Sequence, residues 1–211
     1  MKKIIKLFLG VTLSSLGIAM VTNSCLGTYA ITTTVQAIAN WGTIPFGTAN
    51  LLIELGMIGY ATYKGEGLGW TAIVNALLGS VLISTFLTII PRHPAMFVGI
   101  FIVPLAWAMM GSVGWGDTGS NILMRALMKK TGKDIIIIRT IEEVFFLTIG
   151  FLGARNLVTV FSVIITFVTP LLLKIYYSVI DYRLTEIEQQ FISLRSLIRK
   201  NTLMSILSFL I

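Results

Sequence analysis

Charged side chains inside otherwise apolar segments are the residues most able to do chemistry in this sequence. Arg139 is followed three and four positions later by Glu142 and Glu143, and Glu54 stands in an earlier apolar segment. A charge in the middle of a bilayer costs about 2.5–3.5 kcal/mol, so each needs a partner or a function. Helical spacing places both glutamates within reach of Arg139. This pattern predicts an ion pair that is either structural or part of a coupling or substrate site.

Glu54 has no basic residue within reach on its own helix, and Asn50 lies one turn before it. A carboxyl group isolated in lipid holds its proton unless a cation meets it. We therefore expect Glu54 to pair with Arg139 across the interface between two halves of the protein, or to bind a proton during transport. At Arg139 we expect one glutamate to neutralise the guanidinium and the second to face a polar residue of another span or to exchange protons.

Two short segments, near 28–41 and 118–131, are too polar to face lipid, and each follows a glycine-containing turn. They resemble broken helices, whose free N–H groups can hold an anionic or polar ligand near the middle of the membrane. Asp117 and Ser120 have a second interpretation as helix caps. Asn75, one turn after Thr71, is expected to bond either a neighbouring helix or a substrate.

Together these polar groups define a predicted substrate site between two halves of the protein. Its members are Thr28, Asn50, Glu54, Asn75, Asp117, Asn121, Arg139 and Glu143. We expect no metal ion and no cofactor, because a single histidine, His93, and a single cysteine, Cys25, cannot build a zinc site or an iron–sulfur cluster. The sequence also lacks a nucleotide-binding loop, a nucleophile elbow and an HExxH motif, so an enzyme is not expected.

The composition places these residues in a membrane protein. Of the 211 residues, 55% are hydrophobic and 12% are charged, and the mean hydropathy is +0.89. A soluble domain draws about a quarter of its residues from the charged types. The net charge of +7 is distributed in short clusters between apolar runs. Such clusters are typical of the cytoplasmic flanks of membrane spans, and they argue against a nucleic-acid partner.

Gly, Pro and Asn residues between the apolar runs divide the sequence into six long segments and the two short ones. The long segments lie near 4–23, 47–63, 70–90, 95–112, 135–153 and 157–177. If both short segments cross the bilayer, eight spans result and Lys64 and Arg155 lie outside; if both are re-entrant, six spans result and Arg92 and Arg155 lie outside. We favour eight crossings. Both alternatives place both termini in the cytoplasm, with residues 4–23 kept as a first span rather than cleaved as a signal peptide.

Weak internal similarity divides the chain into related halves, 1–94 and 95–178. Gly27 matches Gly114 at a separation of 87 residues, Gly42 matches Gly132 at 90, and Thr71 matches Thr159 at 88. Membrane transporters are often built from two copies of one unit. Four crossings in each half would give parallel copies, and three would give inverted copies.

Several short motifs carry a family resemblance over roughly residues 5–177. They are Gly47-Thr48-Ala49, Gly67-Leu68-Gly69-Trp70-Thr71, Gly114-Trp115-Gly116-Asp117, and Arg139 followed by Glu143. In these the sequence resembles the YczE/YyaS/YitT group of bacterial integral membrane proteins. It departs from that group's pattern at Thr169-Pro170 and Val158-Thr159. The resemblance implies a protein of the bacterial inner membrane, for which small-molecule export is one suggested activity.

Residues 179–211 have a different character. Apolar residues recur there at three- and four-residue steps, which predicts a cytoplasmic amphipathic helix that lies on the membrane or docks on a protein partner. These residues are Leu184, Ile187, Phe191, Leu194 and Ile198.

The sequence thus predicts an all-α, polytopic transmembrane bundle of two related halves, multi-pass in the bacterial cytoplasmic membrane. The expected function is secondary transport or export of a small solute of peptide-like or amphiphilic character. The alternative is a non-transporting accessory protein that binds another membrane protein or a biosynthetic complex through its tail.

Overall fold

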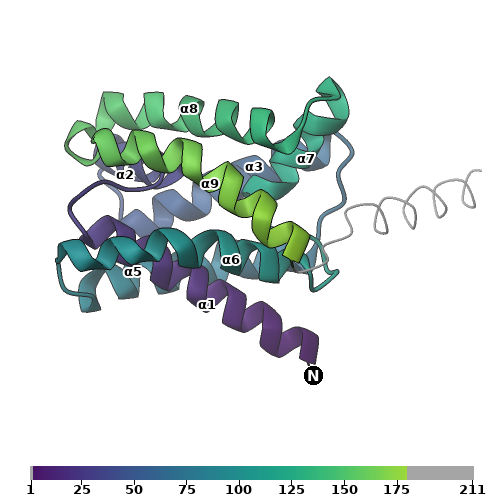
Figure 1. The fold of residues 1–211 in the computed structure, drawn as a ribbon, viewed down its shortest axis with the longest axis horizontal. Coiled ribbons are helices and arrows are strands. Elements are labelled where there is room, and N and C mark those ends of the chain that lie inside the picture. Colours follow the sequence, from purple (N-terminus) through teal and green to yellow (C-terminus); the bar gives the residue numbers. More distant parts are fainter. Residues whose placement is uncertain (1, 180–211) are drawn as a thin grey trace, which may run out of the picture.

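The structure is a computed structural model, and it describes residues 2–179, so the predicted tail helix lies outside the described residues. The described chain is entirely helical (Figure 1). Its α-helices are α1 (Lys2–Asn23), α2 (Ala30–Gly42), α3 (Phe46–Tyr63), α4 (Trp70–Val74), α5 (Ser80–Ile89), α6 (Gly99–Gly111), α7 (Gly119–Thr131), α8 (Ile135–Gly153) and α9 (Val160–Val179). A π-helical turn, η1 (Asn75–Gly79), joins α4 to α5, and the 3-10 turns η2 (Pro94–Val98) and η3 (Arg155–Leu157) precede α6 and α9.

Local sequence fixes several of the helix boundaries. The Thr118 side chain accepts a hydrogen bond from the backbone N–H of Asn121 and so caps the start of α7, while Asp134 caps α8 by accepting from Ile136. At the other end of α7, Gly132 has a φ of 68°, a left-handed conformation that glycine adopts without strain. Asp117 lies one residue before the α7 cap, and Ser120 lies inside the helix, so neither is itself the cap.

Four helical stretches of the described residues are long and apolar enough to cross a membrane. They are Lys3–Asn23, Trp70–Ile89, Pro94–Gly111 and Val160–Ser178. Helices α3 and α8 have comparable lengths, 18 and 19 residues. These two hold Glu54 and the Arg139 cluster, the charged residues that the sequence singled out. The described residues therefore form an integral-membrane type of helical bundle.

The long helices lie roughly along one direction, with α8 and α9 on one side of the bundle and α1 and α5 on the other (Figure 1). The closest packing joins α1 to α6 and α2 to α8, and α3 packs on α7. Helices α1 and α6 are antiparallel, since Gly10 meets Ala106 and Gly17 meets Gly99. Glycine at these positions lets the two backbones approach closely.

Not every glycine within a span serves packing. Small residues within a membrane span often mark a close helix contact, but Gly56 and Gly59 of α3 both face open space. Their side of α3 is an outer surface of the bundle, so these two glycines make no packing contact among the described residues.

The two short helices each return to the end of the bundle from which the chain entered them. Helix α2 runs parallel to α8, with Thr34 bonding the carbonyl of Phe146 at 2.5 Å and Asn40 bonding that of Gly153 at 2.9 Å. Its entry loop lies at the same end, where Thr159 donates to the carbonyl of Leu26. Helix α7 runs parallel to α3 in the same way: it begins beside Glu54, and Lys129 near its end pairs with Glu66 at 2.9 Å.

Candidate functional site

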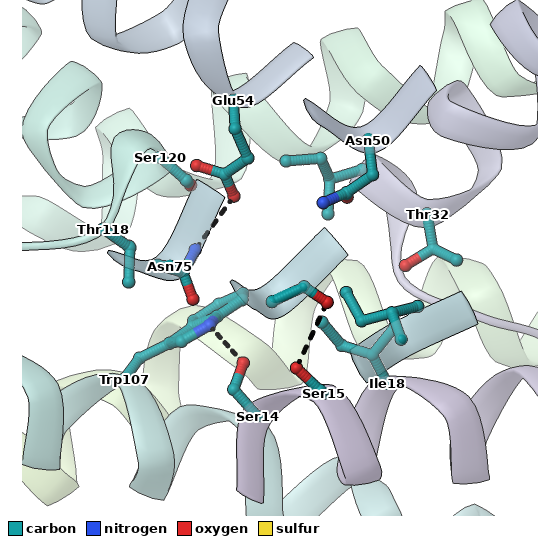
Figure 2. A pocket seen from close by; sticks show the side chains of 13 residues that line it. Ser14, Ser15, Ile18, Thr32, Asn50, Glu54, Asn75, Trp107, Thr118 and Ser120 are labelled. Carbon is teal, nitrogen blue, oxygen red and sulfur yellow. Dashed lines mark hydrogen bonds between the residues drawn. The ribbon is translucent and has the colours of Figure 1, made fainter. Parts of the chain in front are cut away.

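A small polar cavity lies among α1, α2, α3, η1, α6 and α7. Its volume is about 20 Å³, which is room for roughly one water molecule. Three predicted site residues line it, Asn50, Glu54 and Asn75, and Figure 2 shows their side chains converging from α3 and η1. The remaining polar lining residues are Ser14, Ser15, Thr32, Trp107, Thr118 and Ser120.

Glu54 is the acidic residue of this cavity and is 7% exposed. Its Oε1 atom accepts a hydrogen bond of 3.3 Å from the side-chain amide of Asn75. Its Oε2 atom lies against the start of α7, beside Gly119, and makes no hydrogen bond within the described residues. A side chain on Gly119 would collide with this carboxylate, so the glycine permits the close approach of α7 to α3.

Asn75 owes its place to the π-helical turn. It is the first residue of η1, and it interrupts the span that α4 and α5 otherwise form. Single π-helical turns inside α-helices occur frequently at functional sites, because the wider turn shifts side chains and frees backbone carbonyls. Here the carbonyl of Gly79 lies within 3.5 Å of the Ser15 hydroxyl, and Ser80 receives a hydrogen bond of 2.9 Å from Asn50.

The second charged cluster is centred on Arg139, which is 1% exposed. Its guanidinium pairs with both Glu142 and Glu143, each at 3.0 Å. It also donates to Ser120, which donates in turn to Glu142 at 3.0 Å. The face of the guanidinium lies 4.8 Å from the centre of the Trp107 ring. The guanidinium is therefore held on several sides, as a buried charge requires.

The expected pairing of Glu54 with Arg139 is not formed. Arg139 is engaged by the two glutamates of its own helix, because three- and four-residue helical steps bring them closer than any residue of α3. The expectation that one glutamate alone neutralises Arg139 is likewise replaced by a pair with both. Within the described residues, Glu54 has no basic partner at ion-pair distance.

The two clusters share a local geometry at the starts of the short helices. Glu54 of α3 lies against the first backbone amide of α7, at Gly119, and Glu143 of α8 lies against the first backbone amide of α2, at Ala30. The start of a helix carries a partial positive charge, so a carboxylate is favoured there. Both short helices thus direct their positive ends to the interior, and a carboxylate of the other half meets each one.

The other predicted site residues lie outside the cavity. Thr28 is buried in the loop before α2, where its hydroxyl is 2.8 Å from that of Thr22 and its N–H donates to Ser162. Asp117 and Asn121 form a separate polar cluster with Tyr177 of α9: the Asn121 amide donates to Asp117 at 2.7 Å and to the Tyr177 hydroxyl at 2.9 Å. These contacts tie loops and helix ends together at opposite ends of the bundle.

Three cavity residues were not singled out from the sequence. Ser14 and Ser15 are an adjacent polar pair in an apolar span, which was the available signal. Trp107 differs from the other tryptophans in lying within a span rather than at its end, and it donates a hydrogen bond of 3.0 Å to Ser14. Tryptophan is so often an interfacial or packing residue that this position alone could not have identified a site.

A second hollow, of about 270 Å³, lies beside the end of α3. It is lined mainly by Lys64, Glu66, Lys129 and Lys130, none of which belongs to the predicted site. The described residues hold no group of three or more His, Cys, Asp or Glu side chains able to bind a metal ion. Any ion at the central cavity would have to use one carboxylate together with neutral oxygens.

Comparison with protein families adds a single finding. A family described as a family of unknown function, DUF6198, matches residues 1–178. The chain belongs to this family. The match covers all the described helices except the last residue of α9, and the DUF6198 description names neither an activity nor the YczE/YyaS/YitT group. No curated protein and no solved structure matches the chain.

Proposed function

We propose that this DUF6198 member is a secondary transporter of a small solute in the bacterial inner membrane, built from two inverted copies of one unit. The observation that carries the proposal is that the polar cavity and the buried charges lie where the two halves meet. Alternating access between two such halves is a general mechanism of secondary transport.

The two-copy interpretation is supported by an offset of 89 residues that several pairs of corresponding features share. The helix pairs α2 and α7, and α3 and α8, begin 89 residues apart. The carboxylates at the two short-helix starts, Glu54 and Glu143, have the same offset, and so do Gly10 and Gly99 at the interface between α1 and α6. The packing obeys the same relation: α2 on α8 corresponds to α7 on α3, and α1 on α5 to α6 on α9.

The directions of the helices support inverted rather than parallel copies. Helices α1 and α6 occupy corresponding places and run antiparallel. Each short helix returns to its own side, which favours the re-entrant alternative over the eight crossings preferred from the sequence. Each half then has three crossings and one half-helix, and an odd number of crossings inverts the second copy.

Six crossings also agree with the distribution of basic residues. Lys3, Lys64 and Lys129 fall on one side of the bundle, together with the start of α1 and the end of α9, while Arg92 and Arg155 fall on the other. Because cytoplasmic loops carry the excess of Lys and Arg, the first side is the cytoplasmic one. We therefore propose that both termini are cytoplasmic, as the sequence also predicts.

The cavity is too small for an organic solute, so the described conformation is a closed one. Transport requires the halves to move apart around the cavity, which now encloses about 20 Å³. The polar side chains of its lining can be hydrated when the halves separate, whereas Ile18, Ile31 and Ile83 would lose apolar contacts. Hinge or rocking motions of packed helices of this kind are common in transporters.

Labelling of single cysteines with a membrane-impermeant reagent tests the topology. In a Cys25→Ser background, cysteines at positions 43, 65, 92 and 155 are labelled in intact cells. Six crossings place 43, 92 and 155 outside and 65 inside, whereas eight crossings place 65 and 155 outside and 43 and 92 inside. Position 155 is the internal control, since both alternatives place it outside.

Accessibility of the cavity tests transport itself. A small thiosulfonate reagent should modify Thr32→Cys from at least one side of the membrane, because a transporter must open this region to water. Ile165→Cys, buried in the apolar core, is the matched control and should remain unmodified. Protection of Thr32→Cys from both sides would favour the dry, non-transporting accessory protein.

A further inference from the structure

The 89-residue offset exposes one difference between the two short-helix sites. Glu143 and Glu54 correspond, but the residue that corresponds to Arg139 is Asn50. At the start of α2 the carboxylate therefore has a tethered cation, paired at 3.0 Å. At the start of α7 the equivalent carboxylate has a neutral amide nearby and a cavity in front of it.

The charge balance around the cavity and the Arg139 cluster shows the same deficit. Glu54, Glu142 and Glu143 are all at least nine-tenths buried there, and Arg139 is the buried basic residue among them. Asp117 is buried as well, but it belongs to the separate cluster with Asn121 and Tyr177. Two helix starts contribute roughly half a positive charge each. One further monovalent cation would bring the cluster close to neutrality. Uncompensated buried charge is costly, so a cation at this place is favoured.

The polar part of the cavity lining suits a cation, while Ile18, Ile31 and Ile83 form much of the remainder. Asn50 and Asn75 both use their NH₂ groups elsewhere, on Ser80 and Glu54, which leaves their carbonyl oxygens for another partner. Figure 2 shows the oxygen of Asn75 turned away from Glu54. Ser14 accepts from Trp107, and the free Oε2 of Glu54 adds a formal negative charge. Small hard cations prefer such oxygen ligands.

We propose that the cavity at Glu54, Asn50 and Asn75 is a binding site for a dehydrated sodium ion, which takes the place that the Arg139 guanidinium has in the other half. The volume of about 20 Å³ admits one particle of water size. The role of the bound sodium as the coupling ion rests on the proposed transport function, whereas the binding itself does not. Sodium sites formed by a broken helix and neighbouring polar side chains are an established way to couple transport.

Sodium binding is measured on the purified full-length protein in detergent. Thermal unfolding is recorded in sodium chloride and in choline chloride at equal ionic strength, and binding of radioactive sodium is measured directly. Sodium should raise the melting temperature in a saturable way, and Glu54→Gln should weaken sodium binding by about tenfold or more. Glu66→Gln, which removes a carboxylate that follows α3 and pairs with Lys129 away from the cavity, is the control and should keep the response.

A second variant supplies the missing charge. Asn50→Lys places an ammonium group where the second half has Arg139, so it should fold, lose the sodium response, and be at least as stable in choline as the wild type in sodium. Equal stability of the wild type in both salts, or unchanged sodium binding in Glu54→Gln, would overturn the proposal. A response to pH alone, with none to sodium at alkaline pH, would overturn it in favour of a proton.

The binding experiment is independent of solute movement. If sodium does not bind but Thr32→Cys opens to water, the sodium site is wrong and transport stands. If sodium binds and Thr32→Cys stays protected from both sides, the ion is structural and the transport function is the part that fails.

Discussion

Glu143 and Glu54 meet the first turn of a short helix in corresponding places, yet only Glu143 has a guanidinium beside it. Arg139 binds Glu143 and Glu142 in a closed network with Ser120, while Glu54 has one hydrogen bond, from Asn75, and a cavity. The same arrangement of a carboxylate at the start of a short helix therefore has its charge balanced by Arg139 in one half and lacks a neighbouring cation in the other. Of the differences between the two sites, the exchange of Arg139 for the neutral Asn50 is the one that leaves the carboxylate without a cation beside it.

The largest effect on stability is expected when Arg139, the cation of the paired site, is removed. Arg139→Met should destabilise the protein by about 3–5 kcal/mol, because it leaves two buried glutamates without a cation. Unfolding by SDS in mixed micelles measures the loss. Arg92→Met, at an exposed position, should change little. The triple variant that adds Glu142→Gln and Glu143→Gln should recover much of the stability; a triple variant as unstable as Arg139→Met would show that charge is not the cause.

Removing each carboxylate in turn compares the two sites directly. Glu143→Gln should cost about 1.5–3 kcal/mol, since it breaks a charge-assisted contact with Arg139. Glu54→Gln should cost less than about 1 kcal/mol when sodium is absent, because it removes a charge that no basic residue balances. Both are measured by unfolding in choline chloride. An equal loss of unfolding free energy in the two variants would mean that another group balances the charge of Glu54.

The interface between α1 and α6 offers a comparison that involves no charge. A Cβ on Gly99 would lie 2.6 Å from the backbone oxygen of Gly17, whereas one on Gly10 would meet the flexible Met110 side chain. Gly99→Ala should therefore cost about 1–2 kcal/mol and Gly10→Ala less. Gly56→Ala, which faces open space, is the control and should be neutral or stabilising by about 0.5–1 kcal/mol. Thermal unfolding in detergent ranks the three, and a harmless Gly99→Ala would argue against this interface.

The smallest expected effect concerns the caps of the short helices. Thr118 caps α7 with its side chain, while the corresponding residue before α2, Tyr29, makes no such bond. Thr118→Ala should lower the unfolding free energy by about 1 kcal/mol. Thr85→Ala, at an exposed site within α5, serves as the control in the same unfolding assay. No change in Thr118→Ala would indicate that Glu54, rather than Thr118, satisfies the start of α7.

The sequence by itself determined that the protein lies in a membrane and that Arg139 forms an ion pair with glutamates of its own helix. Hydropathy and the scarcity of charge required a membrane bundle, and the three- and four-residue spacing after Arg139 required an ion pair, because both depend only on local composition and helical geometry. The similarities at separations of 87, 88 and 90 residues lie close to the 89 residues that separate the starts of α2 and α7 and the starts of α3 and α8.

The tertiary structure decided which polar residues meet. Thr28, Asp117 and Asn121 looked equivalent to Asn50 and Glu54 in the sequence, but the first three bond loops and helix ends, and only the last two line the cavity. Helices α2 and α7 return to the end of the bundle from which the chain entered them because they pack on α8 and α3. These contacts are distant in the sequence: Thr34 and Phe146, which share a hydrogen bond, are more than a hundred residues apart. The length of the short segments could not distinguish a crossing from a re-entrant helix. A helix of 13 residues can cross a thinned bilayer, and it can equally enter and leave the membrane on one side.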